Sequence, residues 1–152
     1  MSFLPREEFL SLVGRAPLVA IDLVITRPDG CALLGQRNNR PAQGFWFVPG
    51  GRIRKDERLS DALTRIVQTE LGTSAPLTGW RQFGFWEHLY EDNFAGVEGV
   101  STHYLVLAHR LEVSADFSPQ CDAQHSGYAW WPREALLASA DVHDNTRAYF
   151  RP

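Results

Sequence analysis

Changes in the spacing of apolar residues divide the chain into strands and helices. A first helix is predicted at residues 5–13, where Phe9, Leu12 and Val13 recur on one face. Short runs rich in β-branched and aromatic residues predict strands at residues 17–26, 31–37, 45–51, 81–90, 102–113 and 128–131. Helical spacing returns within residues 50–72 and again at residues 132–139 and 144–150. This mixture predicts an α+β fold, an α/β/α sandwich in which a mixed β-sheet lies between the helix of residues 50–72 and the terminal helices.

The helix within residues 50–72 carries a carboxylate at the end of its apolar stripe. At about 100° per residue, Leu59, Leu63 and Ile66 share one stripe and Glu70 falls at its end. Burying a charge costs free energy, and a bound cation would remove that cost. The alternative is a helix-end glutamate whose side chain reaches water. Periodicity alone leaves both interpretations open.

A second carboxylate interrupts the strand at residues 17–26, PLVAIDLVIT, which is otherwise apolar on both faces. In a buried strand, Asp22 needs a hydrogen-bonding or ionic partner, which favours a functional site. The alternative is an edge position at which the carboxylate meets water. Nearby, the strand at residues 31–37 delivers Arg37 at its end, and Gly50 and Gly51 allow a ligand to approach the backbone closely.

Composition limits the classes of protein that fit. With 44% hydrophobic and 12% aromatic residues, residues 1–152 have enough apolar side chains for a single domain with its own core. A formal net charge of −3 argues against non-specific nucleic-acid binding, which needs a basic face. Two cysteines are too few for a disulfide framework, and no segment resembles a signal peptide or a membrane span. We therefore expect a cytoplasmic protein with no membrane partner.

Basic residues are concentrated in one part of this acidic chain. They are Arg37, Arg40, Arg52, Arg54, Lys55, Arg58 and Arg65. Guanidinium groups gathered in this way suit a small polyanionic ligand, because they match phosphate oxygens. For residues 54–58 a solvated charged surface is the preferred explanation.

The spacing of five residues resembles the Nudix signature, GX5EX7REUXEEXGU. The matching residues are Gly51, Glu57, Arg65, Glu70 and Gly72. In that family the signature forms a loop, a helix and a loop that hold a divalent cation against a diphosphate, within the Nudix fold. The match is partial, because Ile66 and Thr69 replace two of the three carboxylates that the pattern has after the arginine.

Longer stretches are similar to the GDP-mannose mannosyl hydrolase branch of this superfamily. They are PLVAIDLVI, LLGQRNNRPAQGFWFVPGGR, THY, DAQH and LLASADVHDNTRAYF, and the likeness extends from about Phe3 to Phe150. That branch shares the depleted signature and hydrolyses GDP-mannose or GDP-glucose to GDP and free sugar. The resemblance implies water attack at the anomeric carbon with inversion, Mg²⁺ as cofactor with Mn²⁺ as a substitute, and a homodimer.

The resemblance also implies roles for individual residues around the metal. Mg²⁺ would be held by the carbonyl of Gly50 and the side chains of Glu70 and Gln124. His125 would be the general base, because an imidazole accepts a proton from water near neutral pH.

Further roles concern the nucleotide and the sugar. The charge on the GDP leaving group would be met by Arg37, Arg52, Arg65 and Tyr104. The sugar would lie against Asp22 and His88, and the substrate-binding set would be Phe3, Leu4, Phe9 and Arg37, of which the first three contact guanine. Arg65 has a structural alternative, a pairing with Glu57 that braces the loop, and both readings stay open.

Two departures leave the sugar preference unsettled. Gln36 and Ala123 stand where the branch often has Lys and Glu, and the loop at residues 92–103 is one residue longer. That loop has little local structure signal and would serve as a lid or a rim. Two other functions stay open: a Nudix diphosphatase that cleaves a nucleotide sugar between its phosphates, and a noncatalytic nucleotide-sugar sensor.

Overall fold

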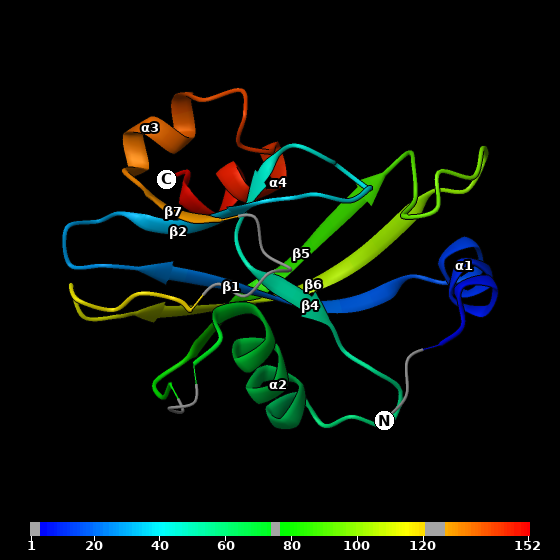
Figure 1. The fold of residues 1–152 in the computed structure, drawn as a ribbon, viewed down its shortest axis with the longest axis horizontal. Coiled ribbons are helices and arrows are strands. Elements are labelled where there is room, and N and C mark those ends of the chain that lie inside the picture. Colours follow the sequence, from blue (N-terminus) through cyan, green and yellow to red (C-terminus); the bar gives the residue numbers. More distant parts are fainter. Residues whose placement is uncertain (1–3, 74–76, 121–126) are drawn as a thin grey trace.

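The computed structural model describes residues 4–73, 77–120 and 127–152 (Figure 1). Its helices are α1 (Arg6–Arg15), α2 (Leu59–Leu71), α3 (Arg133–Ala138) and α4 (Asp144–Arg147), which continues into the 3₁₀ turn η1 (Ala148–Phe150). Its strands are β1 (Leu18–Thr26), β2 (Ala32–Gln36), β3 (Trp46–Phe47), β4 (Gly50–Arg52), β5 (Arg81–Tyr90), β6 (Thr102–Glu112) and β7 (Tyr128–Trp131). Within these described ranges no helix has the length and apolar character needed to cross a membrane.

The central strand of the sheet is β1. It runs parallel to β6 and antiparallel to β2 and β4, and the order across the sheet is β3-β2-β1-β6-β5, with β4 on β1 and β7 on β2. The predicted pairing of the strands at residues 81–90 and 102–113 is confirmed as the antiparallel pair β5 and β6. The predicted α+β fold with a mixed sheet is therefore confirmed.

Helices cover both faces of this sheet, which explains why β1 is apolar on both sides. Ile21, Leu23 and Ile25 pack with Ile66 and Leu71 of α2 in one core cluster. Residues of alternate parity along a strand point to opposite faces. The next cluster accordingly contains Val24, packed with side chains of the C-terminal segment, which are Leu136 of α3, Val142 of the turn before α4, and Tyr149 and Phe150 of η1. In Figure 1, α2 lies on one side of the strands, and α3 and α4 lie on the other.

The helix α2 keeps part of the predicted apolar stripe, but the expected burial of Leu59 is wrong: this residue opens the first turn and is 42% exposed. Its buried residues are Ala62, Ile66, Val67 and Leu71. It ends at Gly72, whose backbone is left-handed, with φ 63°, and whose N–H donates to the carbonyl of Gln68. A left-handed residue that closes the last turn usually is glycine, because a side chain there is strained. The C-terminal end of this helix, where Glu70 lies, is thereby fixed.

The prediction of one strand at residues 45–51 is wrong. The segment forms two short strands on different partners: β3 pairs with β2, with Trp46 opposite Gln36, and β4 pairs with β1, with Gly50 opposite Asp22. Pro49 separates the two strands, and its carbonyl accepts from the N–H of Leu23. A proline has no N–H to donate to a ladder, so the segment changes partner at this residue.

The loop at residues 91–101 has internal structure that its sequence did not indicate. Asn93 is fully buried. Its amide Nδ2 donates to the carbonyls of Val97 and Val100 at 2.7 and 2.8 Å, and its Oδ1 accepts from the N–H groups of Ala95 and Val97. One side chain therefore satisfies four backbone groups. The loop is therefore braced from within by this one side chain.

Candidate active site

Two adjoining clefts open where β1, β2, β3 and β4 meet. The first has a volume of about 230 Å³ and is lined by Gly35, Gln36, Arg37, Asn38, Asn39, Phe47, Val48, Pro49, Gly50, Glu70, Gly127 and Tyr128. The second has a volume of about 110 Å³ and is lined by Ala20, Asp22, Arg37, Pro41, Phe47, Val48, Gly50, Gly51, Arg52, His88, Tyr90, Tyr104 and Val106. Arg37, Phe47, Val48 and Gly50 line both clefts. The structure thus brings together most of the described residues to which the sequence assigned a role.

Glu70 lies in the first cleft and is held by a residue that the sequence did not single out. The hydroxyl of Tyr128 donates to Glu70 Oε2 at 3.0 Å. A charged acceptor strengthens such a hydrogen bond. Glu70 is also the one acidic residue among the described residues that line this cleft. The alternative of a helix-end side chain pointing only into bulk water is therefore not supported.

Gly50 lies at the boundary between the clefts, where no side chain fits. A Cβ atom on Gly50 would lie 2.5 Å from Asp22 Oδ1 and 2.6 Å from the carbonyl oxygen of Ile21. Contacts this short do not occur, so the position requires glycine. The carbonyl of Gly50 and the carboxylate of Glu70 are both hard oxygen donors, the type that Mg²⁺ prefers. Within the described ranges, no three or more His, Cys, Asp or Glu residues form a group that could hold a metal ion.

Two predicted residues, Gln124 and His125, lie outside the described residues, as does Phe3. The described residues on either side of 121–126 both bind the end of α2. The N–H of Gln120 donates to the carbonyl of Leu71 at 2.8 Å, and Tyr128 donates to Glu70. A Cβ atom on Gly72 would collide with the carbonyl oxygen of Gln120. Gln120 and Tyr128 are therefore both attached to the helix turn that presents Glu70.

Asp22 lies in the second cleft and has the partner that its buried position requires. The hydroxyl of Tyr149 donates to Asp22 Oδ2 at 2.6 Å, and the same hydroxyl lies 3.3 Å from His88 Nε2. Burial raises the pKa of Asp22 to about 6, although Tyr149 and the charge of Arg37 act to lower it. Burial lowers the pKa of His88 to about 4, with a smaller contribution from His143. His88 is therefore neutral at pH 7.

Arg37 and Arg52 reach this second cleft in different ways. The Nε of Arg37 is buried and has no hydrogen-bond partner among the described residues, while its guanidinium lies 5.3 Å from the ring centre of Phe47. The guanidinium of Arg52 lies 4.9 Å from the ring centre of Phe9. A buried donor without a partner is costly, and an anionic ligand in the cleft would satisfy it. Tyr104 lines the same cleft, and burial raises the pKa of its hydroxyl.

Arg65 pairs with Glu57, as the structural alternative for this residue predicted. Its Nε donates to Glu57 Oε2 at 2.7 Å, and its Nη2 donates to Glu57 Oε1 and to the carbonyl of Arg52, both at 2.8 Å. The Glu57 side chain is only 6% exposed, so this ion pair is largely shielded from water. Arg65 lines neither cleft. It braces the loop between β4 and α2.

The predicted base-contacting residues lie beside the clefts. Phe9 of α1 packs on Phe94 of the loop at residues 91–101, with ring centres 4.9 Å apart, and its ring also contacts Arg52. Leu4 is 42% exposed. Neither Leu4 nor Phe9 lines a cleft, but Arg52 joins Phe9 to the second one. The sequence did not predict that Phe94 would pack against Phe9.

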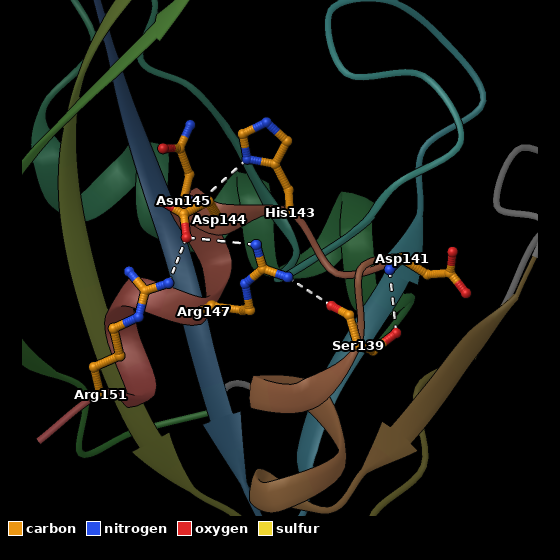
Figure 2. Close-up of polar contacts among 7 residues, drawn as sticks. All are labelled: Ser139, Asp141, His143, Asp144, Asn145, Arg147 and Arg151. Atoms are coloured by element: carbon orange, nitrogen blue, oxygen red, sulfur yellow. Dashed lines mark hydrogen bonds and ion pairs between the residues drawn. The ribbon is translucent and has the colours of Figure 1, made fainter.

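The C-terminal segment supports the second cleft from behind. The hydroxyl of Tyr90 accepts a hydrogen bond from Asn145 Nδ2 at 3.2 Å. Figure 2 shows the polar contacts around this segment: His143 Nδ1 accepts from the N–H of Asn145, and Arg147 donates to the carbonyl of Ser139. Arg147 and Arg151 both reach Asp144 (Figure 2). These contacts hold α4 and η1 in place, and η1 carries Tyr149.

A third hollow, of about 510 Å³, contains none of the residues to which the sequence assigned a role. It lies between the β1–β2 turn, β6 and the C-terminal segment, and four arginines line it: Arg27, Arg110, Arg133 and Arg151. Arg27 pairs with Asp29, and Arg151 pairs with Asp144. Tyr149 lines this hollow too, while its hydroxyl reaches Asp22 on the other side.

Comparisons with known proteins agree with this architecture. A family model described as the NUDIX domain matches residues 16–151. The chain is similar to the low-salt glycan biosynthesis protein Agl8 of Haloferax volcanii, with 43% identity over 124 residues that cover 81% of this chain and 76% of that protein. It is similar to the nucleoside triphosphatase NudI of Escherichia coli (strain K12), with 26% identity over 121 residues, 80% of this chain and 83% of that protein. A crystal structure of the MutT NUDIX hydrolase from Burkholderia pseudomallei matches with a TM-score of 0.69 and 22% identity, over 90% of this chain and 97% of that one. The chain belongs to the Nudix hydrolase family.

Proposed function

We propose that this chain hydrolyses GDP-mannose, and GDP-glucose with it, to GDP and free sugar. The observation that carries the proposal is the separation of the acidic residues. Among the described lining residues, Glu70 is the one acid of the first cleft and Asp22 is the one acid of the second. Attack on phosphorus uses several carboxylates that hold more than one metal ion. A single carboxylate instead suits a site that neutralises a leaving diphosphate. The name of the similar Haloferax protein, a glycan biosynthesis protein, is compatible with this substrate class.

The residues present fit one Mg²⁺ in the first cleft. The carbonyl of Gly50 and the carboxylate of Glu70 supply oxygen donors there, with Gln124 as the third proposed donor. When bound, Mg²⁺ supplies positive charge to the diphosphate.

The cationic residues between the clefts would bind the leaving group. Arg37 offers a buried donor that has no partner among the described residues, and Arg52 lies at the same cleft. Donors that already point at the place where charge develops lower the barrier without reorganising. Tyr104 adds a hydroxyl there. Arg65 acts indirectly, by holding the carbonyl of Arg52.

The sugar would occupy the second cleft and meet Asp22 and His88. His125 is the proposed general base, and it would take a proton from the water that attacks the anomeric carbon from the face opposite GDP. That geometry inverts the configuration, so α-linked mannose leaves first as the β anomer. Leu4 and Phe9, with Phe3, would contact guanine. The proposal extends to a cytoplasmic homodimer, for which the exposed Phe85 and Leu89 of the outer strand β5 offer an apolar surface.

The similarity to a nucleoside triphosphatase favours a second candidate, a diphosphatase that attacks phosphorus. Hydrolysis of GDP-mannose in ¹⁸O-labelled water with Mg²⁺ distinguishes the two. We expect the label in the sugar and none in GDP. Label in a phosphate, or GMP and sugar phosphate as products, would establish the second candidate. Tight binding without turnover would establish a noncatalytic sensor.

A further inference from the structure

One buried hydroxyl connects the two polar residues of the second cleft. Tyr149 is 4% exposed, and its hydroxyl lies 2.6 Å from Asp22 Oδ2 and 3.3 Å from His88 Nε2. These three residues come from η1, β1 and β5, so the contact forms only when the C-terminal segment packs on the sheet. Tyr149 itself does not line the cleft.

The direction of each hydrogen bond follows from counting hydrogens. The hydroxyl has one hydrogen, and it donates that hydrogen to the carboxylate of Asp22. Its oxygen can then only accept from His88, which must carry its hydrogen on Nε2. Because His88 is neutral, its Nδ1 has no hydrogen and is an acceptor. The chain of hydrogen bonds therefore runs from His88 through Tyr149 to Asp22.

The ring of Tyr149 is held so that the hydroxyl cannot leave this position easily. It packs edge-on against Trp86, with ring centres 4.8 Å apart, and against Phe83 at 5.8 Å. The backbone behind it is fixed by the hydrogen bond from Arg147 to Ser139 (Figure 2). A buried, fully used hydroxyl of this kind orients its partners more than it strengthens the fold.

We propose that Tyr149 is a positioning residue that makes one end of the second cleft a surface of hydrogen-bond acceptors. With Oδ2 bound to Tyr149, Asp22 keeps Oδ1, which lies against Gly50, as an acceptor that has no hydrogen-bond donor among the described residues. His88 keeps Nδ1. Such a surface selects ligands that present hydroxyl donors, as a sugar does, and disfavours ligands that present only acceptors, because two acceptors facing each other leave both without a partner. The inference rests on the proposed function, since it names the group of the substrate that this end of the cleft recognises.

Tyr149→Phe removes the hydroxyl and keeps the ring. We expect kcat/KM for GDP-mannose to fall roughly 10- to 100-fold, the usual cost of a hydrogen bond to a charged group, mostly through KM. The inhibition constant of GDP, which has no sugar, should stay within about twofold of the wild-type value, because its contacts lie in other parts of the clefts. The matched control is Thr102→Val, which removes another buried hydroxyl, one that donates to the carbonyl of Asp92 at 2.7 Å.

The tautomer of His88 provides a readout that does not depend on turnover. Nitrogen-15 NMR of the wild-type protein should show the hydrogen on Nε2, and Tyr149→Phe should shift the ring towards a mixture of tautomers. If the wild-type protein carries the hydrogen of His88 on Nδ1, the proposal is wrong. This test needs no variant, so it remains decisive even if Tyr149→Phe folds poorly. Two results would show that Tyr149 acts only through stability. One is a rise of the inhibition constant of GDP in Tyr149→Phe as large as the rise of KM, and the other is an equal loss of kcat/KM in Thr102→Val. If the wild-type protein does not hydrolyse GDP-mannose, the proposed function fails while the NMR result still decides the hydrogen-bond chain.

Discussion

The two clefts that meet at Gly50 are built in different ways. The first takes its acid from the end of α2, and the loop before that helix is braced by an ion pair between Glu57 and Arg65, all within one short segment. The second takes its acid from β1 and orients it with Tyr149, which lies 127 residues further along the chain. A local motif can therefore place the acid of the first cleft, whereas the orientation of the acid in the second cleft depends on the completed fold.

The largest effect is expected from the first cleft. Glu70→Gln keeps an acceptor for Tyr128 but removes the one acid among the described lining residues. We expect Mg²⁺-dependent turnover to fall by on the order of 10³ or more, because metal charge stabilisation is worth several kcal/mol. Far-UV circular dichroism and the melting temperature should change little. The control is Glu87→Gln on the exposed side of β5, and near wild-type activity of Glu70→Gln at modest Mg²⁺ would refute the assignment.

The local bracing can be separated from catalysis by a pH titration of stability. The ion pair with Arg65 lowers the pKa of Glu57 to about 2 from its ordinary value of 4.5. Glu57 therefore stabilises the fold fully above pH 4.5, and this contribution is lost as the pH falls towards 2. Glu57→Gln should lower the free energy of unfolding by about 1–3 kcal/mol at pH 7, the usual range for hydrogen bonds to a charged group, and by much less near pH 2.

Urea unfolding at several pH values measures this difference. Asp56→Asn is the matched control, because Asp56 pairs with Lys55 and both side chains are more than four-fifths exposed, at 83% and 90%. An exposed pair contributes about 0–1 kcal/mol, so the control should change little. A pH-independent loss in Glu57→Gln would mean that the ion pair is not the source of the stability.

A smaller effect is expected where the end of α2 meets Gln120. Gly72→Ala introduces strain at φ 63° and a collision with the carbonyl oxygen of Gln120. Gly30→Ala has the same kind of strain, at φ 86°, but meets nothing within 4 Å. Each of the two variants should lose about 1 kcal/mol of unfolding free energy from backbone strain alone. Only Gly72→Ala should also lower kcat, by roughly 10-fold, since a small misplacement of catalytic groups slows the reaction. Equal kinetics in the two variants would show that this anchor does not position the site.

Sequence reasoning reached the order of the elements because apolar spacing is a local signal. It also placed Glu70 in the last turn of α2, where the structure has it beside the first cleft, but it wrongly placed Leu59 on the buried face. It missed the break at Pro49, because apolar and aromatic residues continue on both sides and the change of partner depends on two separate strands. It left the role of Arg65 open, since only the folded loop shows that its donors are used by Glu57 and Arg52.

The supporting tyrosines were not predictable from local pattern. Tyr128 sits in an aromatic strand and Tyr149 in an apolar helical segment, and both look like core residues. The one available signal is general: a buried tyrosine hydroxyl usually has a partner. Which partner it finds depends on packing between elements that lie far apart in the sequence. The sequence alone therefore could not show that Tyr128 binds Glu70 or that Tyr149 binds Asp22.

The loop at residues 91–101 depends on the chemical integrity of one side chain, that of Asn93. Its four backbone partners are held by a single side-chain amide, and asparagine is among the residues that degrade on heating. Loss of that amide nitrogen by deamidation would put a carboxylate oxygen opposite the carbonyls of Val97 and Val100, so two attractive contacts would become repulsive together. Ageing of the protein should therefore open this loop in one step, and with it the packing of Phe94 on Phe9.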